Sequence, residues 1–195
     1  MESEAAEFPY PVVGGDLRIS YDLFGSKKHL GVTRGDLAFA DSSDAIVFRV
    51  KRYSPKSSPP NKKVLLDAAT GNALLSIHRD HDGFWECYKG DSNEDKDLVF
   101  TVHRSRKTFT RVELQVFLVG ETSEGSTSNF RVTGCPFQRS CKIFRGNDVL
   151  AQTCLMYKLN QTFVSRSKFR LTIFPGFSNQ ALIVALVVIF LNGRK

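Results

Sequence analysis

Cysteine is scarce in this chain. Its 195 residues include four cysteines, at positions 87, 135, 141 and 154. None belongs to a CxxC pair, and no spacing of cysteine and histidine matches a zinc site. A chain of this length can bury roughly 70% of its unfolded surface, so it needs neither disulfides nor a structural metal to fold. We therefore predict four reduced thiols, as in a cytoplasmic protein.

A long hydrophobic run is also lacking. The longest, at 181–191 (ALIVALVVIFL), has 11 residues, whereas a helix that spans a bilayer needs about 20. The N-terminal segment MESEAAEFPYPVV is acidic and has no apolar centre, unlike a signal peptide. These features predict no transmembrane segment and a cytoplasmic location, with at most peripheral attachment to a membrane.

Catalytic and metal-binding signatures are absent. No G-x-S-x-G elbow or Walker loop occurs. The tripeptide His-Arg-Asp at 78–80 has the letters of a kinase catalytic loop, but no Gly-rich phosphate loop precedes it. Residues 91–97 begin like a calcium loop, yet Lys96 stands where Gly is required and Val102 where Glu is required. We therefore expect no enzymatic activity, no cofactor and no metal site.

Alternation of apolar and polar residues fills most of the chain. Val112, Leu114, Val116 and Leu118 alternate with polar residues, which is typical of a half-buried strand. Polar or Pro-rich loops at 54–61 and 121–128 are too short to separate domains, so we predict one domain. Many short strands at close spacing indicate a sandwich or a barrel. Strand-like segments occur at 17–23, 46–52, 63–68, 73–78, 84–89, 98–103, 112–118, 130–133, 141–145, 149–157 and 171–173.

The apolar run at 181–191 gives conflicting local signals. It is apolar on every side, which in a globular protein means burial on every side. Its many β-branched residues favour a strand, whereas its length favours a helix. Pro175-Gly176 interrupts the preceding strand, and Ser178 or Asn179 can serve as an N-cap. We favour a helix.

Segments spread along the chain share a pattern with one plant family. They are the D-x-x-x-G-x-x-L turn at 67–74, the segment from Trp85 to Gly90, and Phe-Pro-Gly at 174–176 ahead of the apolar run. The chain resembles the LURP-one-related family over roughly residues 8–191. It departs from the family at 41–44 (DSSD), where the family usually turns with Gly. It also departs near 178–179, where the family usually has an Asp that opens the helix.

The resemblance implies a specific architecture. LURP-one-related proteins are similar to the tubby C-terminal domain and to the phospholipid scramblases. The resemblance therefore implies a mostly β fold, a closed antiparallel barrel of about twelve strands around a central apolar C-terminal helix at 179–191. Residues 1–195 would form a single tubby C-terminal-like domain with a core at about 8–191. It also implies a role in plant defence.

Basic residues predominate over acidic ones. The chain has 27 Lys and Arg against 20 Asp and Glu, a formal net charge of +7, which favours polyanionic partners. The densest cluster, at 103–111, lies between two predicted strands, where we expect a hairpin loop whose cations converge on a phosphate. Our candidate ligands for an anionic headgroup are Arg104, Arg106, Lys107, Arg111, Lys51 and Arg52. Further basic clusters contain Lys56, Lys62, Lys63, Arg139, Lys142, Arg145, Arg166, Lys168 and Arg170.

Three functions are compatible with these features. We favour a non-catalytic module that binds anionic phospholipid headgroups at a membrane surface. A scaffold for an unknown protein partner is the first alternative. A nucleic-acid-binding regulator of transcription is the second, and nucleic acid is the less expected partner because no helix-turn-helix, zinc finger or RNA-recognition motif is present.

Overall fold

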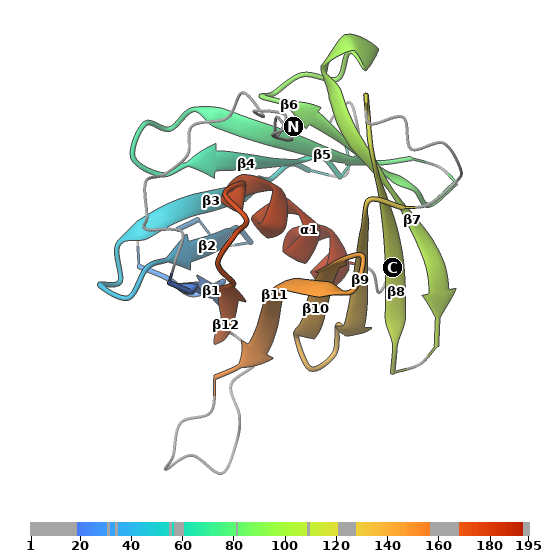
Figure 1. Ribbon diagram of the computed structural model, residues 1–195. Helices are drawn as coiled ribbons and strands as arrows, with labels where there is room; N and C mark the ends of the chain where they lie inside the picture. The colour runs from blue at the N-terminus through green and yellow to red at the C-terminus, as the bar shows by residue number, and fades with distance from the viewer. Residues whose placement is uncertain are drawn as a thin grey trace, which may run out of the picture.

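A closed antiparallel barrel forms the body of the molecule (Figure 1). The computed structural model describes residues 19–30, 32–33, 35–54, 56, 61–80, 82–108, 110–120, 128–156 and 168–192. Within them, strands run in the order β1, then β12 back to β2, so that hairpins connect neighbours and β1 pairs with β12 to close the ring. The strands are β1 (Tyr21–Ser26), β2 (Leu37–Ala40), β3 (Ile46–Arg52), β4 (Lys63–Asp67), β5 (Ala73–Arg79), β6 (Trp85–Lys89), β7 (Leu98–Lys107), β8 (Val112–Leu118), β9 (Phe130–Cys135), β10 (Ser140–Arg145), β11 (Asp148–Leu155) and β12 (Lys168–Ile173). A short 3-10 helix, η1 (Asp95–Asp97), precedes β7.

The barrel confirms the predicted fold class, with differences at the ends of strands. β1 begins at Tyr21 rather than at residue 17, and residue 17 lies outside the described residues. β2 was not predicted, because all four of its residues are buried and it shows no alternation. β7 continues to Lys107, four residues beyond the predicted end, and this extension changes the position of the candidate cations.

The C-terminal helix fills the barrel. α1 (Gln180–Asn192) lies inside the ring of strands (Figure 1), and every residue from Ala181 to Phe190 is buried. A ring of twelve strands encloses more space than its own inward side chains can fill, so an apolar helix is a suitable filling. The backbone N–H of Leu182 donates to Oδ1 of Asn179 at 3.0 Å, which confirms Asn179 as the N-cap.

The helix is shorter than a bilayer span. α1 has 13 residues, and the part of the chain that the structure describes contains no helix with the length and hydrophobicity to cross a bilayer. Its apolar residues pack with those of the barrel wall in one buried cluster.

We predict that the four thiols divide into two classes of reactivity. All four cysteines are free; Cys87 and Cys141 are buried, whereas Cys135 and Cys154 are half-buried. Burial raises the pKa of Cys87 well above its usual value, and raises the pKa of Cys141 to about 12 against an opposing hydrogen bond from Thr153. Because the thiolate is the reactive form, Ellman's reagent should label two thiols rapidly in the native protein and four in denaturant without reductant. Four rapid thiols in the native protein, or fewer than four after denaturation, would contradict this assignment.

Candidate anion-binding site

The candidate cations gather at one end of the barrel. Consecutive strands are antiparallel, so the ends of β1, β3, β5, β7 and β9 all lie at the same opening. The C-terminus of α1 also lies there, because Asn192 and Leu191 line a cavity together with Arg52 at the end of β3. We call this opening the C-terminal mouth.

A β-bulge separates the cations of β7. Arg104 pairs with fully buried Leu114, so its side chain is on the inner face of the barrel. A bulge lies between Arg104 and Arg106, and Arg106 pairs with Glu113 on the outer face. The predicted convergence of Arg104, Arg106 and Lys107 in a hairpin loop is therefore not what the structure shows. The residues belong to a strand, and the bulge turns Arg106 to the face opposite Arg104, although residues two apart in a regular strand share a face.

Arg104 contacts the single tryptophan of the chain. Its guanidinium carbon lies 5.2 Å from the centroid of the Trp85 ring, and the guanidinium of Arg79 lies at the same distance. Burial lowers the pKa of Arg104, and the nearby positive charge of Arg79 lowers it further. Two guanidinium groups thus flank one buried indole at the C-terminal mouth.

Lys51 and Arg52 also occupy opposite faces. Lys51 is exposed, with its ammonium 5.2 Å from the centroid of the Tyr53 ring. Arg52 pairs with Lys63, which in turn pairs with buried Ile77, so both cations lie on the inner face. The backbone N–H of Arg52 donates to the Asp36 carboxylate at 3.1 Å. The six predicted ligands therefore do not form one cluster.

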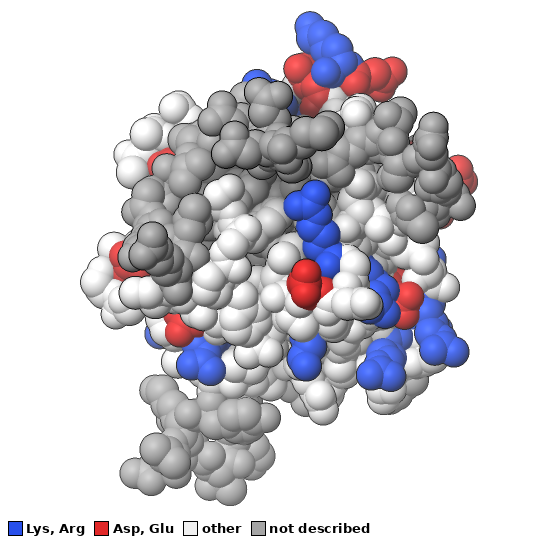
Figure 2. Space-filling view, viewed as in Figure 1, with Lys and Arg blue, Asp and Glu red and all other residues white. Residues whose placement is uncertain are grey.

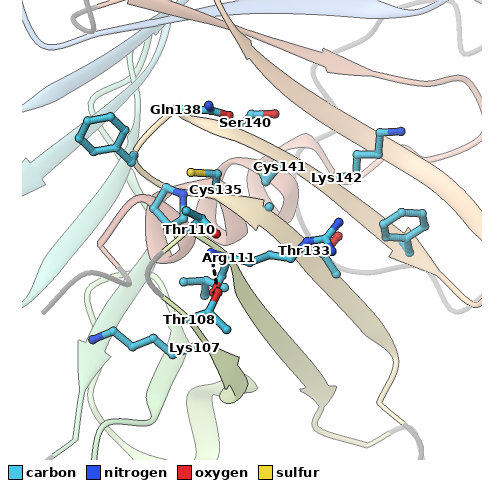
Figure 3. Close-up of a pocket in the computed structure, with 15 residues that line it drawn as sticks. Lys107, Thr108, Thr110, Arg111, Thr133, Cys135, Gln138, Ser140, Cys141 and Lys142 are labelled. Atoms are coloured by element: carbon cyan, nitrogen blue, oxygen red, sulfur yellow. Dashed lines mark hydrogen bonds between the residues drawn. The ribbon is translucent and has the colours of Figure 1, made fainter.

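An open groove on the outer side of β8, β9 and β10 is lined by two of the six candidate ligands, Lys107 and Arg111 (Figure 3). It has a volume of about 1160 Å³. A third cation, Lys142, also lines the groove. The sequence analysis placed Lys142 in a basic cluster but not among the six candidate ligands. In Figure 3, Arg111 extends toward Thr133, whereas Lys107 ends on the opposite side. The described lining residues include no Asp or Glu, and the polar or aromatic ones are Thr108, Thr110, Thr133, Gln138, Ser140, Phe137 and Phe144.

A tight turn positions Arg111 at this groove. The backbone N–H of Thr108 donates to the carbonyl of Arg111 at 2.8 Å, and the N–H of Arg111 donates to Oγ1 of Thr108 at 3.0 Å. These bonds hold the two ends of the β7–β8 connection together. The cation is thus preorganised, and less conformational entropy is lost when it binds an anion.

The groove combines ligands for a phosphate. Lysine and arginine provide charge-assisted hydrogen bonds, and threonine and serine hydroxyls provide neutral donors. Figure 2 shows Lys and Arg side chains along the lower rim of the molecule. In the same view in Figure 1, the arrowheads of β7 and β9 point toward this rim. Among the described residues, no group of three or more His, Cys, Asp or Glu could hold a metal ion. The arrangement is suited to binding an anion.

Comparisons with known proteins agree with the fold. A family model described as LURP-one-related matches residues 21–191. LURP-one-related 7 of Arabidopsis thaliana is 49% identical over 189 residues, which cover 96% of this chain and 98% of that protein. LURP1 of the same plant is 26% identical over 174 residues, covering 87% and 82% of the two chains. The X-ray structure of an Arabidopsis thaliana protein has the same fold, with a TM-score of 0.64 at 24% identity over 90% of this chain and 91% of the other.

These matches confirm the resemblance seen in the sequence. The names of the relatives denote no enzymatic activity. The family match begins at the first residue of β1 and ends in the last turn of α1, so it includes the whole barrel and its central helix. The chain belongs to the LURP-one-related family.

Proposed function

We propose that the protein is a non-catalytic, cytoplasmic module that attaches peripherally to membranes by binding anionic phospholipid headgroups. The outer groove supports the proposal: three cations and several hydroxyls line it, and its described lining contains no acid. The setting that we propose, plant defence signalling, comes from the family resemblance alone.

Attachment through this groove would be reversible. Each Lys or Arg close to an anionic surface contributes about 1 kcal/mol, so Lys107, Arg111 and Lys142 together contribute about 3 kcal/mol. Phe137 lines the same groove and is 49% exposed. An aromatic ring at the edge of a basic groove can enter the headgroup layer while the cations bind phosphate. The groove thus offers both of the contacts that a peripheral lipid-binding surface needs.

We predict that the groove cations dominate vesicle binding. Changing Lys107, Arg111 and Lys142 together to Ala should weaken binding to phosphatidylcholine vesicles that contain phosphatidylserine by about 100-fold. Vesicle sedimentation at fixed ionic strength measures the effect. A matched control removes the same charge elsewhere by changing Lys62, Lys89 and Lys96 to Ala. In the native chain, Lys62 and Lys96 lie within 2.7 Å and 2.6 Å of the carboxylates of Asp91 and Glu94.

Two results would contradict the proposal. Equal losses in both triple variants would show that only net charge matters. Tighter binding to duplex DNA than to the anionic vesicles at the same salt concentration, with a steep salt dependence, would favour a nucleic-acid partner.

A further inference from the structure

A cavity inside the C-terminal mouth shares two lining residues with the outer groove. The cavity has a volume of about 300 Å³, the groove has a volume of about 1160 Å³, and Pro136 and Phe137 line both. These two residues begin the turn at 136–139, which connects β9 to β10. The turn is therefore the partition between the groove and the cavity.

This partition is one short turn with an aromatic side chain on it. The backbone N–H of Gln138 donates to the carbonyl of Cys135 at 3.1 Å, and the N–H of Arg139 donates to the carbonyl of Pro136 at 3.3 Å. Pro136 is buried, whereas Phe137 is 49% exposed. A rotamer change of Phe137 breaks neither hydrogen bond, so the ring can move aside for a ligand while the turn stays in place.

The inner part of the cavity is apolar. Leu37 of β2, Val50 of β3 and Val188 of α1 line it and are buried. Leu191, in the last turn of α1, also lines it and is half-buried. The side-chain amide of Asn192 donates to the carbonyl of Val188, so this acceptor near the end of the helix already has a partner. An apolar ligand can therefore lie against the end of α1 without leaving that carbonyl unpaired.

The outer part of the cavity is polar. Lys27 and Arg52 line it and are exposed. Long basic side chains lay their methylene stems along an apolar surface while their charged ends stay in water. The cavity thus has an apolar floor and a charged rim, which suits the tail of an amphipathic molecule. The other described lining residues are Gly35, Lys63, Arg139 and Asn192.

We propose that this cavity receives an acyl chain of the phospholipid whose headgroup lies in the outer groove, with the chain passing over the turn beside Phe137. The inference rests on the proposed function, because the groove provides the headgroup site. A ligand in the groove that contacts Pro136 and Phe137 already contacts the wall of the cavity, so one molecule can occupy both. A methylene group takes up about as much space as a water molecule in the liquid, about 30 Å³, so the cavity holds on the order of ten of them.

A series of lysophosphatidic acids, from butanoyl to tetradecanoyl, tests this inference. They all carry a phosphate for the groove and differ only in the length of one acyl chain. Each is used below its critical micelle concentration, and its affinity is measured by isothermal titration calorimetry. The affinity should increase about 2- to 4-fold for each added methylene until the cavity is full, and should then level off.

Variants of Leu191 show whether the chain enters the cavity. Leu191→Trp places a larger side chain in the cavity and should flatten the increase in affinity with chain length. Leu191→Ala enlarges the cavity and should move the plateau to chains about three carbons longer. The matched control is Val119→Trp, because Val119 is 54% exposed and lines neither the cavity nor the groove. It should leave the series unchanged, and thermal melts show that each variant is folded.

The same series separates this inference from the proposed function. The groove variant, with Lys107, Arg111 and Lys142 changed to Ala, should bind every member more weakly but keep the same increase per methylene. Equal binding by the groove variant and the unaltered protein would contradict the proposed function. An affinity independent of chain length, or an increase that Leu191→Trp leaves intact, would overturn the acyl-chain site and leave the groove as a headgroup site.

A free fatty acid is the competing occupant of the cavity. Octanoic acid should bind more weakly than octanoyl lysophosphatidic acid, because its carboxylate lacks the glycerol phosphate that reaches the groove. Tighter binding of octanoic acid, with no loss in the groove variant, would assign the cavity to a free fatty acid and overturn its link to the groove.

Discussion

Leu186→Asp is expected to prevent the chain from folding. Leu186 is fully buried in the middle of α1, with the barrel wall around the helix. An unpaired carboxylate in such a core costs several kcal/mol, against a total stability of about 5–15 kcal/mol for a domain. The variant should be insoluble or molten, without the near-UV circular dichroism signal of packed aromatic side chains. Deleting residues 181–195 should have the same effect, because the barrel would lose its filling.

Two controls show whether burial causes the effect. Leu30→Asp introduces the same charge at a leucine that is 91% exposed, and it should melt cooperatively near the normal temperature. Leu186→Met conserves volume and should cost less than about 1.5 kcal/mol. A monomeric Leu186→Asp protein, or a monomeric truncated protein, with a sharp near-UV melt would show that the barrel is stable without the helix.

Gly134→Ala should cause the second largest loss of stability. Gly134 on β9 pairs with Val112 on one side and with Cys141 on the other. A Cβ atom there would lie 2.1 Å from the carbonyl oxygen of Ser140 and 2.6 Å from Cα of Cys141. Both are backbone atoms that cannot rotate away, so β9 and β10 would have to separate. We expect a loss of about 3 kcal/mol, seen as a melting temperature lower by roughly 6–12 °C.

Gly71→Ala provides the comparison for Gly134→Ala. Gly71 has a positive φ of 74°, but a Cβ atom there meets nothing within 4 Å. That substitution should cost only the conformational strain of about 1–2 kcal/mol. If Gly134→Ala melts at or above the temperature of Gly71→Ala, then close approach of the strands is not what requires a glycine at 134.

Local signals in the sequence were sufficient for most of the strands. Alternation marks β8 from Val112 to Leu118 because one face of the strand meets the core and the other meets solvent. The same signal is absent from β2, whose side chains are buried on both faces. Closure into a barrel around a helix came from the family resemblance, because strand periodicity alone is equally compatible with a sandwich.

The end of β7 shows how a strong charge pattern can mislead. The segment 103–107 is rich in Arg and Lys, which favours a loop, yet it pairs with β8 as far as Val112. Pairing with a neighbouring strand satisfies its backbone groups and so outweighs its polar composition. Alternation alone would place Arg104 and Arg106 on the same face, and the bulge between them is what leaves Arg104 inside and Arg106 outside.

The sequence by itself determined most of the strands and the basic character of the chain, and it narrowed the N-cap to Ser178 or Asn179, between which the structure decided for Asn179. For residues 181–191 the local signals for strand and helix conflicted. The tertiary structure decided for a helix, because a closed barrel has no free edge with which another strand could pair. Only the tertiary structure showed that Lys27, Arg79 and Arg139, far apart in the chain, face the same opening. The physical reason is that closing the barrel brings the ends of alternate strands together, whereas sequence spacing records only neighbours along one strand.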